Sequence, residues 1–383
     1  VDQVAGALNI GGNCKALMFM QSNGGLTDAR KFQGKDAILS GPAGGIVGMV
    51  QTGQQAGFDK LIGFDMGGTS TDVSHFAGKF ERSFETEVAG VRMRAPMMDI
   101  HTVAAGGGSI CSYRDGRFQV GPESAGADPG PASYRRGGPL TVTDCNVILG
   151  ALSVDYFPAV FGVSGTLPLD AQAAVARIEA LAAHHGLEGT AEDMAQGFLD
   201  IAVQNMANAI KKISVERGHD ITSYTLQSFG GAGGQHACLV AEALGMSRVM
   251  VHPFAGVLSA YGMGLADVRC LREGQLDCDL SDTDQVSARL AILQEAARTE
   301  LLSQGITDPR LEFTAHLRYE GSHQSLGVAY GGQQKMVADF EAAHMARFGF
   351  ASPDRKLRYE MLSVEAIGEM AHAATPSQNF GSG

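Results

Sequence analysis

The sequence lacks several short motifs that identify large enzyme classes. It contains no GxxxxGK[ST] phosphate-binding loop, and no GxGxxG stands between a strand-like and a helix-like segment. These absences exclude a Walker-type loop and weaken a dinucleotide-binding interpretation. The HExxH, GxSxG and paired CxxC motifs are absent as well, so the common zinc-protease, serine-hydrolase and zinc-ribbon patterns do not apply.

Long charged or apolar runs are also missing. Charged residues make up 18 % of the chain, and the formal net charge is -12. This negative balance argues against broad binding to nucleic acids or anionic membranes, although it allows a local basic pocket for a nucleotide. No apolar stretch is long enough to cross a membrane, and no signal peptide is recognisable. We therefore expect a cytoplasmic protein that binds neither nucleic acids nor membranes.

Cysteine is scarce and irregularly spaced. The six cysteines lie mostly in apolar surroundings, without the spacing of a metal site or a disulfide framework. They are predicted to be reduced, buried thiols of a cytosolic protein. They are Cys14, Cys111, Cys145, Cys238, Cys270 and Cys278.

The most informative segment that is present is LIGFDMGGTSTDVS, residues 61–74. Two strand-like runs flank a short turn, which predicts a β-hairpin. The two glycines of the turn tolerate positive φ and allow backbone N–H groups to face an anion. Three hydroxyl residues add donors, and the two flanking aspartates could hold a hydrated divalent cation. An ordinary glycine turn is the alternative.

Other segments with many small residues surround this hairpin in the sequence. Residues 40–57 and 256–268 are predicted to be helices that closely approach a neighbouring backbone. Residues 224–245 have the order strand, GGAGG turn, helix, which often holds a nucleotide near a helix N-terminus. Further helices are predicted at 171–185, 191–217, 283–304 and 337–348, and strands at 16–20, 310–319 and 325–330. Residues 121–138, with three prolines, are predicted to be an irregular connection.

The order of these elements is similar to the second lobe of the actin-like ATPase superfamily. Longer motifs resemble the hydantoinase A / 5-oxoprolinase family, and the RGHD and FGGAGGQHA versions are most similar to 5-oxoprolinases. The segments that carry the resemblance are SGPAGGIVG, IGFDMGGTSTDVS, APMMDIHTVAAGGGS, GPESAGADPGPASYRRGGPLTVTD, RGHD and FGGAGGQHACLVAEALGM.

The resemblance implies an α/β fold: an actin-like, ribonuclease H-like lobe followed by a small C-terminal α+β domain. We expect residues 1–40 to be the remnant of a preceding lobe, 41–270 the nucleotide-binding lobe, and 271–383 the C-terminal domain and tail. The family carries an earlier hairpin of the same kind, and this chain has only one. It is therefore expected to be a fragment that lacks the N-terminal lobe and a hydantoinase B-type segment or subunit, and that is inactive alone.

The resemblance also implies a reaction. The chain would be the ATP-binding portion of an enzyme of glutathione metabolism that opens 5-oxo-L-proline to L-glutamate by phosphorylating the lactam oxygen. The implied partners are a cyclic-amide substrate, ATP and Mg²⁺, and a full-length protein is expected to be a homo-oligomer. The alternatives are an N-methylhydantoinase, a subunit of an ATP-dependent ketone carboxylase, or a non-catalytic nucleotide-binding module.

Residue roles follow from the positions that match the family motifs. Asp65 and Asp72 are the expected catalytic groups, with Asp65 organising Mg²⁺ through the nucleotide. Arg217 is expected on a helix face that reaches adenine or solvent, and Asp99 is expected in a structural hydrogen bond. For His236, nucleotide contact and helix capping stay open. The expected cofactor-binding residues are Gly67, Gly68, Thr69, Thr71, Gly107, Gly108, Gly230, Gly231, Gly233, Gly234, Gln235 and His236.

Overall fold

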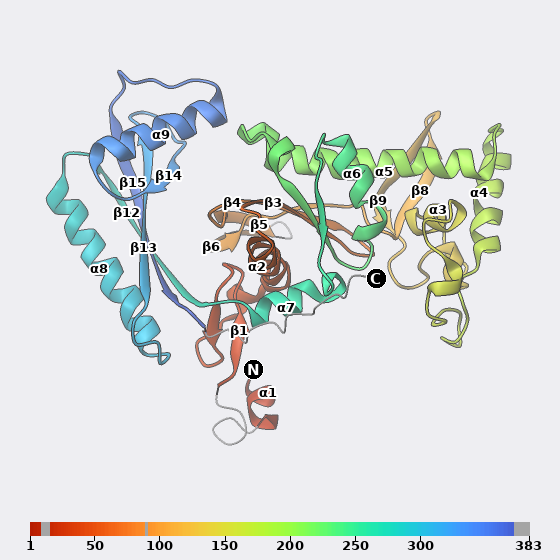
Figure 1. Cartoon of the computed structure of the whole chain (residues 1–383), viewed down its shortest axis with the longest axis horizontal. Helices are drawn as coiled ribbons and strands as arrows, with labels where there is room; N and C mark the ends of the chain where they lie inside the picture. The colour runs from red at the N-terminus through yellow and green to blue at the C-terminus, as the bar shows by residue number, and fades with distance from the viewer. Residues whose placement is uncertain (9–15, 89–90, 371–383) are drawn as a thin grey trace. The chain divides into compact units, whose positions relative to one another are not determined.

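The computed structural model describes residues 1–8, 16–88 and 91–370, which divide into two compact units. Unit 1 consists of Val1–Gly48, Ser83–Met97 and Ser259–Gly383, and unit 2 consists of Met49–Arg82 and Met98–Leu258. Each unit has its own large sheet and a smaller two-stranded sheet (Figure 1). Each also has its own hydrophobic core. The chain is thus a mixed α/β protein, as predicted.

Unit 2 is built on a five-stranded sheet with the order β11-β10-β3-β4-β7. β10 pairs in parallel with β3 and β11, whereas β4 pairs antiparallel with β3 and β7. Because Phe229 pairs with Asp65, β10 and β3 end at the same edge of the sheet. The strands are β3 (Lys60–Met66), β4 (Thr71–Ala77), β7 (His101–Val103), β10 (Thr225–Phe229) and β11 (Val249–Val251).

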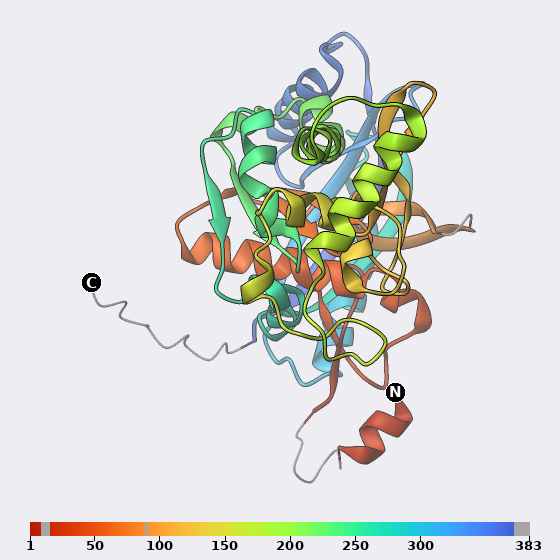
Figure 2. The same cartoon turned by 90° about the vertical axis from the view of Figure 1, so that its right-hand side faces the viewer.

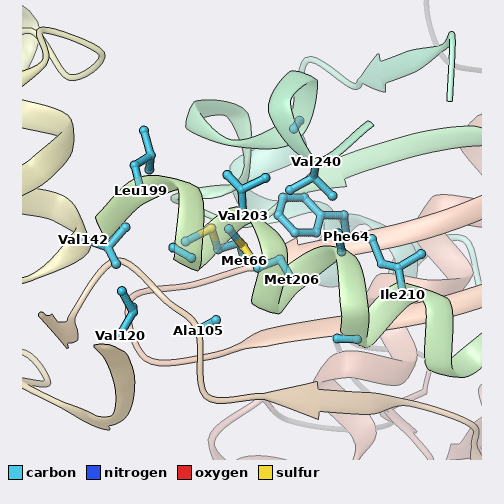
Figure 3. Close-up of a cluster of buried hydrophobic side chains, with 14 of the residues drawn as sticks. Phe64, Met66, Ala105, Val120, Val142, Leu199, Val203, Met206, Ile210 and Val240 are labelled. Carbon is cyan, nitrogen blue, oxygen red and sulfur yellow. The ribbon is translucent and has the colours of Figure 1, made fainter. Parts of the chain in front are cut away.

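One face of this sheet packs against helix α5 (Ala191–Ile213). Thr190 and Asp193 form a capping box that starts the helix, and its apolar residues recur every three or four positions, as predicted. Figure 3 shows Phe64 and Met66 of β3 beside Val203 and Met206 of α5, all within one buried cluster. Burial of this apolar surface holds β3 in place.

The opposite face of the sheet packs against the second half of helix α2 (Ser40–Gln55). A Cβ atom at Gly53 would lie 2.4 Å from Leu61 Cδ1, and one at Gly63 would lie 2.8 Å from Met49 Sδ. Only glycine allows the helix and the strand to approach this closely. The predicted tight crossing of this small-residue helix is confirmed.

The remaining helices of unit 2 pack around α5. Thr141 and Asp144 form the capping box of α3 (Val142–Ile148), and Asp170 caps α4 (Ala171–His185). In Figure 2, α5 is seen end-on with α4 beside it. The other elements are β8 (Ser109–Arg114), β9 (Arg117–Ser124) and α6 (Ala237–Ala243), with 3₁₀ turns at Ala132–Tyr134, Val154–Tyr156, Val215–Arg217, Ile221–Ser223, Gly233–Gln235 and Ala255–Val257.

Unit 1 contains a six-stranded sheet with the order β1-β2-β12-β15-β13-β14. Helix α8 packs on β12 and β15, and α9 packs on β14 (Figure 1). The elements are α1 (Asp2–Ala7), β1 (Met18–Met20), β2 (Leu26–Asp28), a 3₁₀ turn at Gly34–Ala37, β5 (Arg82–Val88), β6 (Val91–Met98), α7 (Leu258–Gly264), β12 (Val268–Asp279), α8 (Thr283–Leu302), β13 (Arg310–Tyr319), β14 (Leu326–Ala329), α9 (Gln333–Phe348) and β15 (Leu357–Gly368).

The first half of α2 and helix α7 cross in close contact within unit 1. A Cβ atom at Gly262 would lie 2.0 Å from Gly44 O and 2.5 Å from Gly48 N. A Cβ atom at Gly44 would lie 2.6 Å from Ser259 O. Backbone atoms cannot move aside like a flexible side chain, so the crossing requires glycine on both helices.

We expect Gly262→Ala to destabilise the protein by about 1–3 kcal/mol, because the added methyl group overpacks this crossing. Gly264→Ala is the matched control, since a Cβ atom there meets nothing within 4 Å. Urea unfolding of both variants measures the difference. Equal midpoints for the two variants would contradict the tight crossing.

The structure corrects three predictions. The helix predicted at 256–268 is only α7 (Leu258–Gly264), and residues up to 124 of the predicted irregular connection belong to β9. Cys238 is exposed rather than buried; Cys111, Cys145, Cys270 and Cys278 are buried, and all five are free. Cys14 lies outside the described residues. Within the described part of the chain, every helix is too short or too polar to span a bilayer.

Candidate functional site

The predicted hairpin is present and brings its two aspartates together. Asp65 pairs directly with Asp72 across β3 and β4, one residue before β3 ends. The turn is closed by a hydrogen bond from Gly67 N to Ser70 O of 3.0 Å. Gly68 and Thr69 at its tip are exposed. The turn therefore offers backbone and hydroxyl donors beside two carboxylates.

Among the residues that the structure describes, the two carboxylates have no cationic partner. Burial, and then the charge of Asp72, raise the pKa of Asp65 to about 6. Burial also raises the pKa of Asp72, although a hydrogen bond of 2.6 Å from Thr102 Oγ1 opposes it. In the part of the chain that the structure describes, no lysine or arginine lowers either pKa. A bound cation would relieve this repulsion.

The raised pKa of Asp65 predicts a pH-dependent stability without nucleotide and metal. The folded state holds this proton more tightly than the unfolded state, whose pKa is near 3.8. The free energy of unfolding should therefore fall as pH rises from about 4 to about 6, by at most about 1.4 kcal/mol per pH unit. Urea unfolding with a chelator present should show this slope in the parent and a smaller one in Asp65→Asn. Identical slopes would contradict the prediction.

A second glycine-rich segment, residues 104–109, packs against the turn of the hairpin and forms hydrogen bonds with it. Gly107 N donates to Gly67 O at 3.2 Å, and Gly108 N donates to Gly68 O at 2.6 Å. A Cβ atom at Gly106 would lie 2.5 Å from the backbone of Thr69. The N–H groups of Gly107 and Gly108 are thus already used to hold the turn, which assigns them a supporting role. Their predicted contact with a ligand stays a prediction.

The hydroxyl of Thr71 is also engaged inside the protein. Thr71 is fully buried, and its Oγ1 donates a hydrogen bond to Ala105 O. Ser109 Oγ accepts from Gly106 N at 2.8 Å. These bonds fix residues 104–109 against the start of β4. Thr71 therefore shapes the turn, whereas Thr69 keeps an exposed hydroxyl.

The GGAGG turn follows β10 and lies at the same sheet edge as the hairpin. Ala232 N donates to Met66 O at 2.9 Å, and Gly230 N donates to Ala255 O at 3.0 Å. Gly230 has φ +82°, and a Cβ atom there would lie 2.5 Å from Asp65 Oδ1. Gly231 and Gly234 are exposed, while Gly233 is buried. The structure thus brings Asp65 and the GGAGG turn into contact.

Asn146 of α3 organises the residues after this turn. Its Nδ2 donates to Gln235 Oε1 at 2.8 Å and lies 3.1 Å from His236 Nε2. His236 is fully buried, its Nδ1 lacks a partner among the described residues, and burial lowers its pKa to about 4. Its side chain makes no capping hydrogen bond, so the capping alternative is wrong. His236 is a neutral, buried group held by Asn146.

Sequence reasoning missed three residues of this site: Thr102, Thr143 and Asn146. Thr102 bonds Asp72, and Thr143 N donates to Gly107 O at 2.8 Å. The segment LTVTDCN, residues 140–146, contains Thr143 and Asn146. A capping box followed by a polar residue was the available indication that a short helix begins there.

The fold and the site define a mixed α/β protein whose candidate site lies where two glycine-rich turns meet at one sheet edge. The family model described as hydantoinase/oxoprolinase matches residues 1–272. The chain belongs to this family.

Curated relatives agree with this assignment. The chain is 43% identical over 372 residues to the 5-oxoprolinase of Saccharomyces cerevisiae, covering 92% of this chain and 28% of the yeast protein. It is 41% identical over 374 residues to 5-oxoprolinase 1 of Arabidopsis thaliana, covering 92% of this chain and 29% of that protein. The chain thus spans less than a third of the length of these relatives.

Two solved structures share the fold. The ATP-dependent caprolactamase from Pseudomonas jessenii superposes with a TM-score of 0.82 at 32% identity, covering 94% of this chain and 55% of that chain. Nucleotide-free acetone carboxylase superposes with a TM-score of 0.68 at 24% identity, covering 97% of this chain and 55% of that chain. The second comparison supports the fold alone.

Proposed function

We propose that this chain is the ATP-binding portion of an ATP-dependent cyclic-amide hydrolase that opens 5-oxo-L-proline to L-glutamate. The observation that carries the proposal is the facing pair Asp65 and Asp72, which lies beside a glycine turn and lacks a cationic partner among the described residues. The similarity to named 5-oxoprolinases supports the choice of substrate.

The residues at this edge fit ATP with Mg²⁺. The Asp65 and Asp72 carboxylates offer the oxygen ligands that Mg²⁺ and its water shell prefer. Exposed Gly68 and Thr69 supply donors for phosphate, and exposed Gly231 and Gly234 suit the adenosine side. This assignment corresponds to the phosphate and adenosine elements of an actin-like lobe, which we propose for unit 2 together with α2.

ATP would supply the activation that an unstrained lactam needs. Transfer of the γ-phosphoryl group from ATP to the lactam oxygen would release ADP, make the ring carbon electrophilic and turn that oxygen into part of a phosphate leaving group. The contribution of this chain is to position phosphate and to balance its charge with a metal held near Asp65. We further propose that turnover requires an N-terminal lobe and a hydantoinase B-type partner, and that the complete enzyme is a cytoplasmic homo-oligomer.

Phosphate release in the complete enzyme tests the proposal. ATP hydrolysis should be stimulated by 5-oxo-L-proline and not by N-methylhydantoin, caprolactam, or acetone with bicarbonate. Stimulation by one of the other compounds alone would assign the chain to that reaction. ATP binding without stimulation by any of them would favour a non-catalytic nucleotide-binding module.

We expect Gly68→Ala to weaken ATP binding about 10-fold or more without loss of stability. A Cβ atom at Gly68 meets no protein atom within 4 Å, so the protein itself tolerates the methyl group, whereas a phosphate held against the backbone does not. Gly331→Ala, equally free of neighbours, is the control. Calorimetric ATP titration and thermal unfolding measure the two effects. Unchanged ATP affinity would remove Gly68 from the site.

A further inference from the structure

A second cluster of chemically active side chains lies in unit 2, outside the glycine turns. It consists of His75 from β4, Glu81 from the turn before β5, and His219 from the segment after α5. One ligand atom from each residue lies within 4.8 Å of the other two. His75 is buried, while the other two are partly exposed. The RGHD motif thus supplies His219 to a site that the proposed nucleotide function does not use.

The geometry of the three donor atoms suits a metal ion. Zinc–ligand bonds of about 2.0–2.2 Å separate tetrahedral donors by about 3.4 Å. His75 Nδ1 lies 2.7 Å from Glu81 Oε1, and His219 Nε2 lies 4.0 Å from the same oxygen. These two distances bracket the tetrahedral separation. The imidazole rings of His75 and His219 stack with centroids 4.1 Å apart.

A salt-bridge network alone does not account for His219. At 4.0 Å, its Nε2 is too far from Glu81 for a hydrogen bond. Within the described residues, this nitrogen has no hydrogen-bond partner, although it points toward a carboxylate. The 4.0 Å gap between this nitrogen and the carboxylate oxygen leaves the nitrogen available to a metal ion.

Neighbouring side chains orient the other two donors. Tyr224 Oη lies 3.0 Å from His75 Nε2, which directs Nδ1 toward Glu81. Arg217 Nη1 donates to Glu81 Oε2 at 3.0 Å, which leaves Oε1 turned toward the histidines. Metal-binding histidines commonly use their second nitrogen in such a bond. His75 Nδ1 and Glu81 Oε1 are therefore both held in the orientation that a metal requires.

The local charge also allows a cation. Arg217 contributes one positive charge, and its partners Glu81 and Asp99 contribute two negative charges. Lys60 lies farther out, 5.5 Å from the ring centroid of Tyr224. This arrangement leaves one negative charge in excess beside the histidines, which a bound cation can balance.

We propose that His75, Glu81 and His219 bind one divalent transition-metal ion, with zinc as the best match. Two imidazole nitrogens and one carboxylate oxygen form a common zinc ligand set, and water completes a tetrahedron. The metal takes the place of the proton between His75 and Glu81. It ties the segment after α5 to β4 and to the turn before β5, which stabilises this side of unit 2. The inference is independent of the proposed nucleotide site.

Metal uptake tests the site in the protein that carries these 383 residues. The protein and its His219→Gln variant are stripped with a chelator, dialysed against Zn²⁺, and analysed for bound zinc. The parent should retain one zinc more than the variant, and added Zn²⁺ should raise the melting temperature of the parent alone. The matched control replaces His184 and His185, the exposed neighbours at the end of α4, with glutamine. This control should retain as much zinc as the parent.

Cobalt gives an independent measurement of the ligand geometry. Co²⁺ in the stripped parent should produce the visible absorption of a tetrahedral site, and His219→Gln should lose it. Tyr224→Phe should keep the absorption but weaken Co²⁺ affinity about 10–100-fold, as expected when the partner of a metal-binding histidine is removed. Equal zinc and cobalt uptake by parent and His219→Gln, or loss of the bound metal in the His184/His185 control, would overturn the proposal.

Discussion

Replacing Asp65 with asparagine should lower substrate-dependent ATP hydrolysis by about 10²–10³-fold in the complete enzyme, the usual loss for one charge-stabilising group. Asp65 stands at the sheet edge where β3 ends, faces Asp72 in register, and touches the GGAGG turn at Gly230. Its carboxylate thus contacts both turns. Asparagine keeps the shape of the side chain and removes its charge.

The expected loss concerns catalysis and not folding. The neutral amide removes both the cost of burying a charge and the repulsion from Asp72, which together raise the pKa of Asp65, so Asp65→Asn should be at least as stable as the parent at pH 7. Asp59→Asn, at an exposed position just before β3, is the matched control. Steady-state phosphate release and thermal unfolding distinguish the two effects. Parental activity in Asp65→Asn would place the catalytic centre elsewhere.

Local patterns in the sequence were sufficient to predict both turns of the site. The hairpin follows from two strand-like runs around Gly67 and Gly68, and the second turn follows from GGAGG between a strand and a helix. Their meeting at one edge follows from the parallel pairing of β3 and β10, which the structure shows. Glycines between two strand-like runs, or between a strand and a helix, strongly favour a turn. The two turns could therefore be predicted from local sequence alone.

Contacts between distant residues could not be predicted in the same way. Asn146 reaches Gln235 and His236 from a helix of only seven residues, too short to show helical periodicity. His75, Glu81 and His219 are separated by up to 144 positions, and no spacing rule connects them. The strand β12 carries charged residues at half-buried positions, which hides its alternation. In each case tertiary packing, and not local propensity, determines the arrangement.

Gly230→Ala should destabilise unit 2 by about 3 kcal/mol, because two unfavourable terms act together. Alanine at φ +82° costs about 1–2 kcal/mol, and the methyl group would lie 2.5 Å from both Asp65 Oδ1 and Met66 O, an overpacking of about 1–3 kcal/mol. Relief of the clash would push Asp65 away from Asp72. The same variant should therefore also lose ATP hydrolysis.

Two control variants separate the backbone cost of alanine at positive φ from the cost of overpacking. Gly186→Ala has a positive φ of 64° but no neighbour within 4 Å of the new Cβ atom, so it carries only the backbone cost. Gly231→Ala has neither a positive φ nor a close neighbour and should leave stability unchanged. Urea unfolding should rank the variants with Gly230→Ala least stable, Gly186→Ala intermediate and Gly231→Ala equal to the parent. If Gly230→Ala and Gly186→Ala are equally stable, Gly230 does not contact Asp65, and the two turns do not form one site.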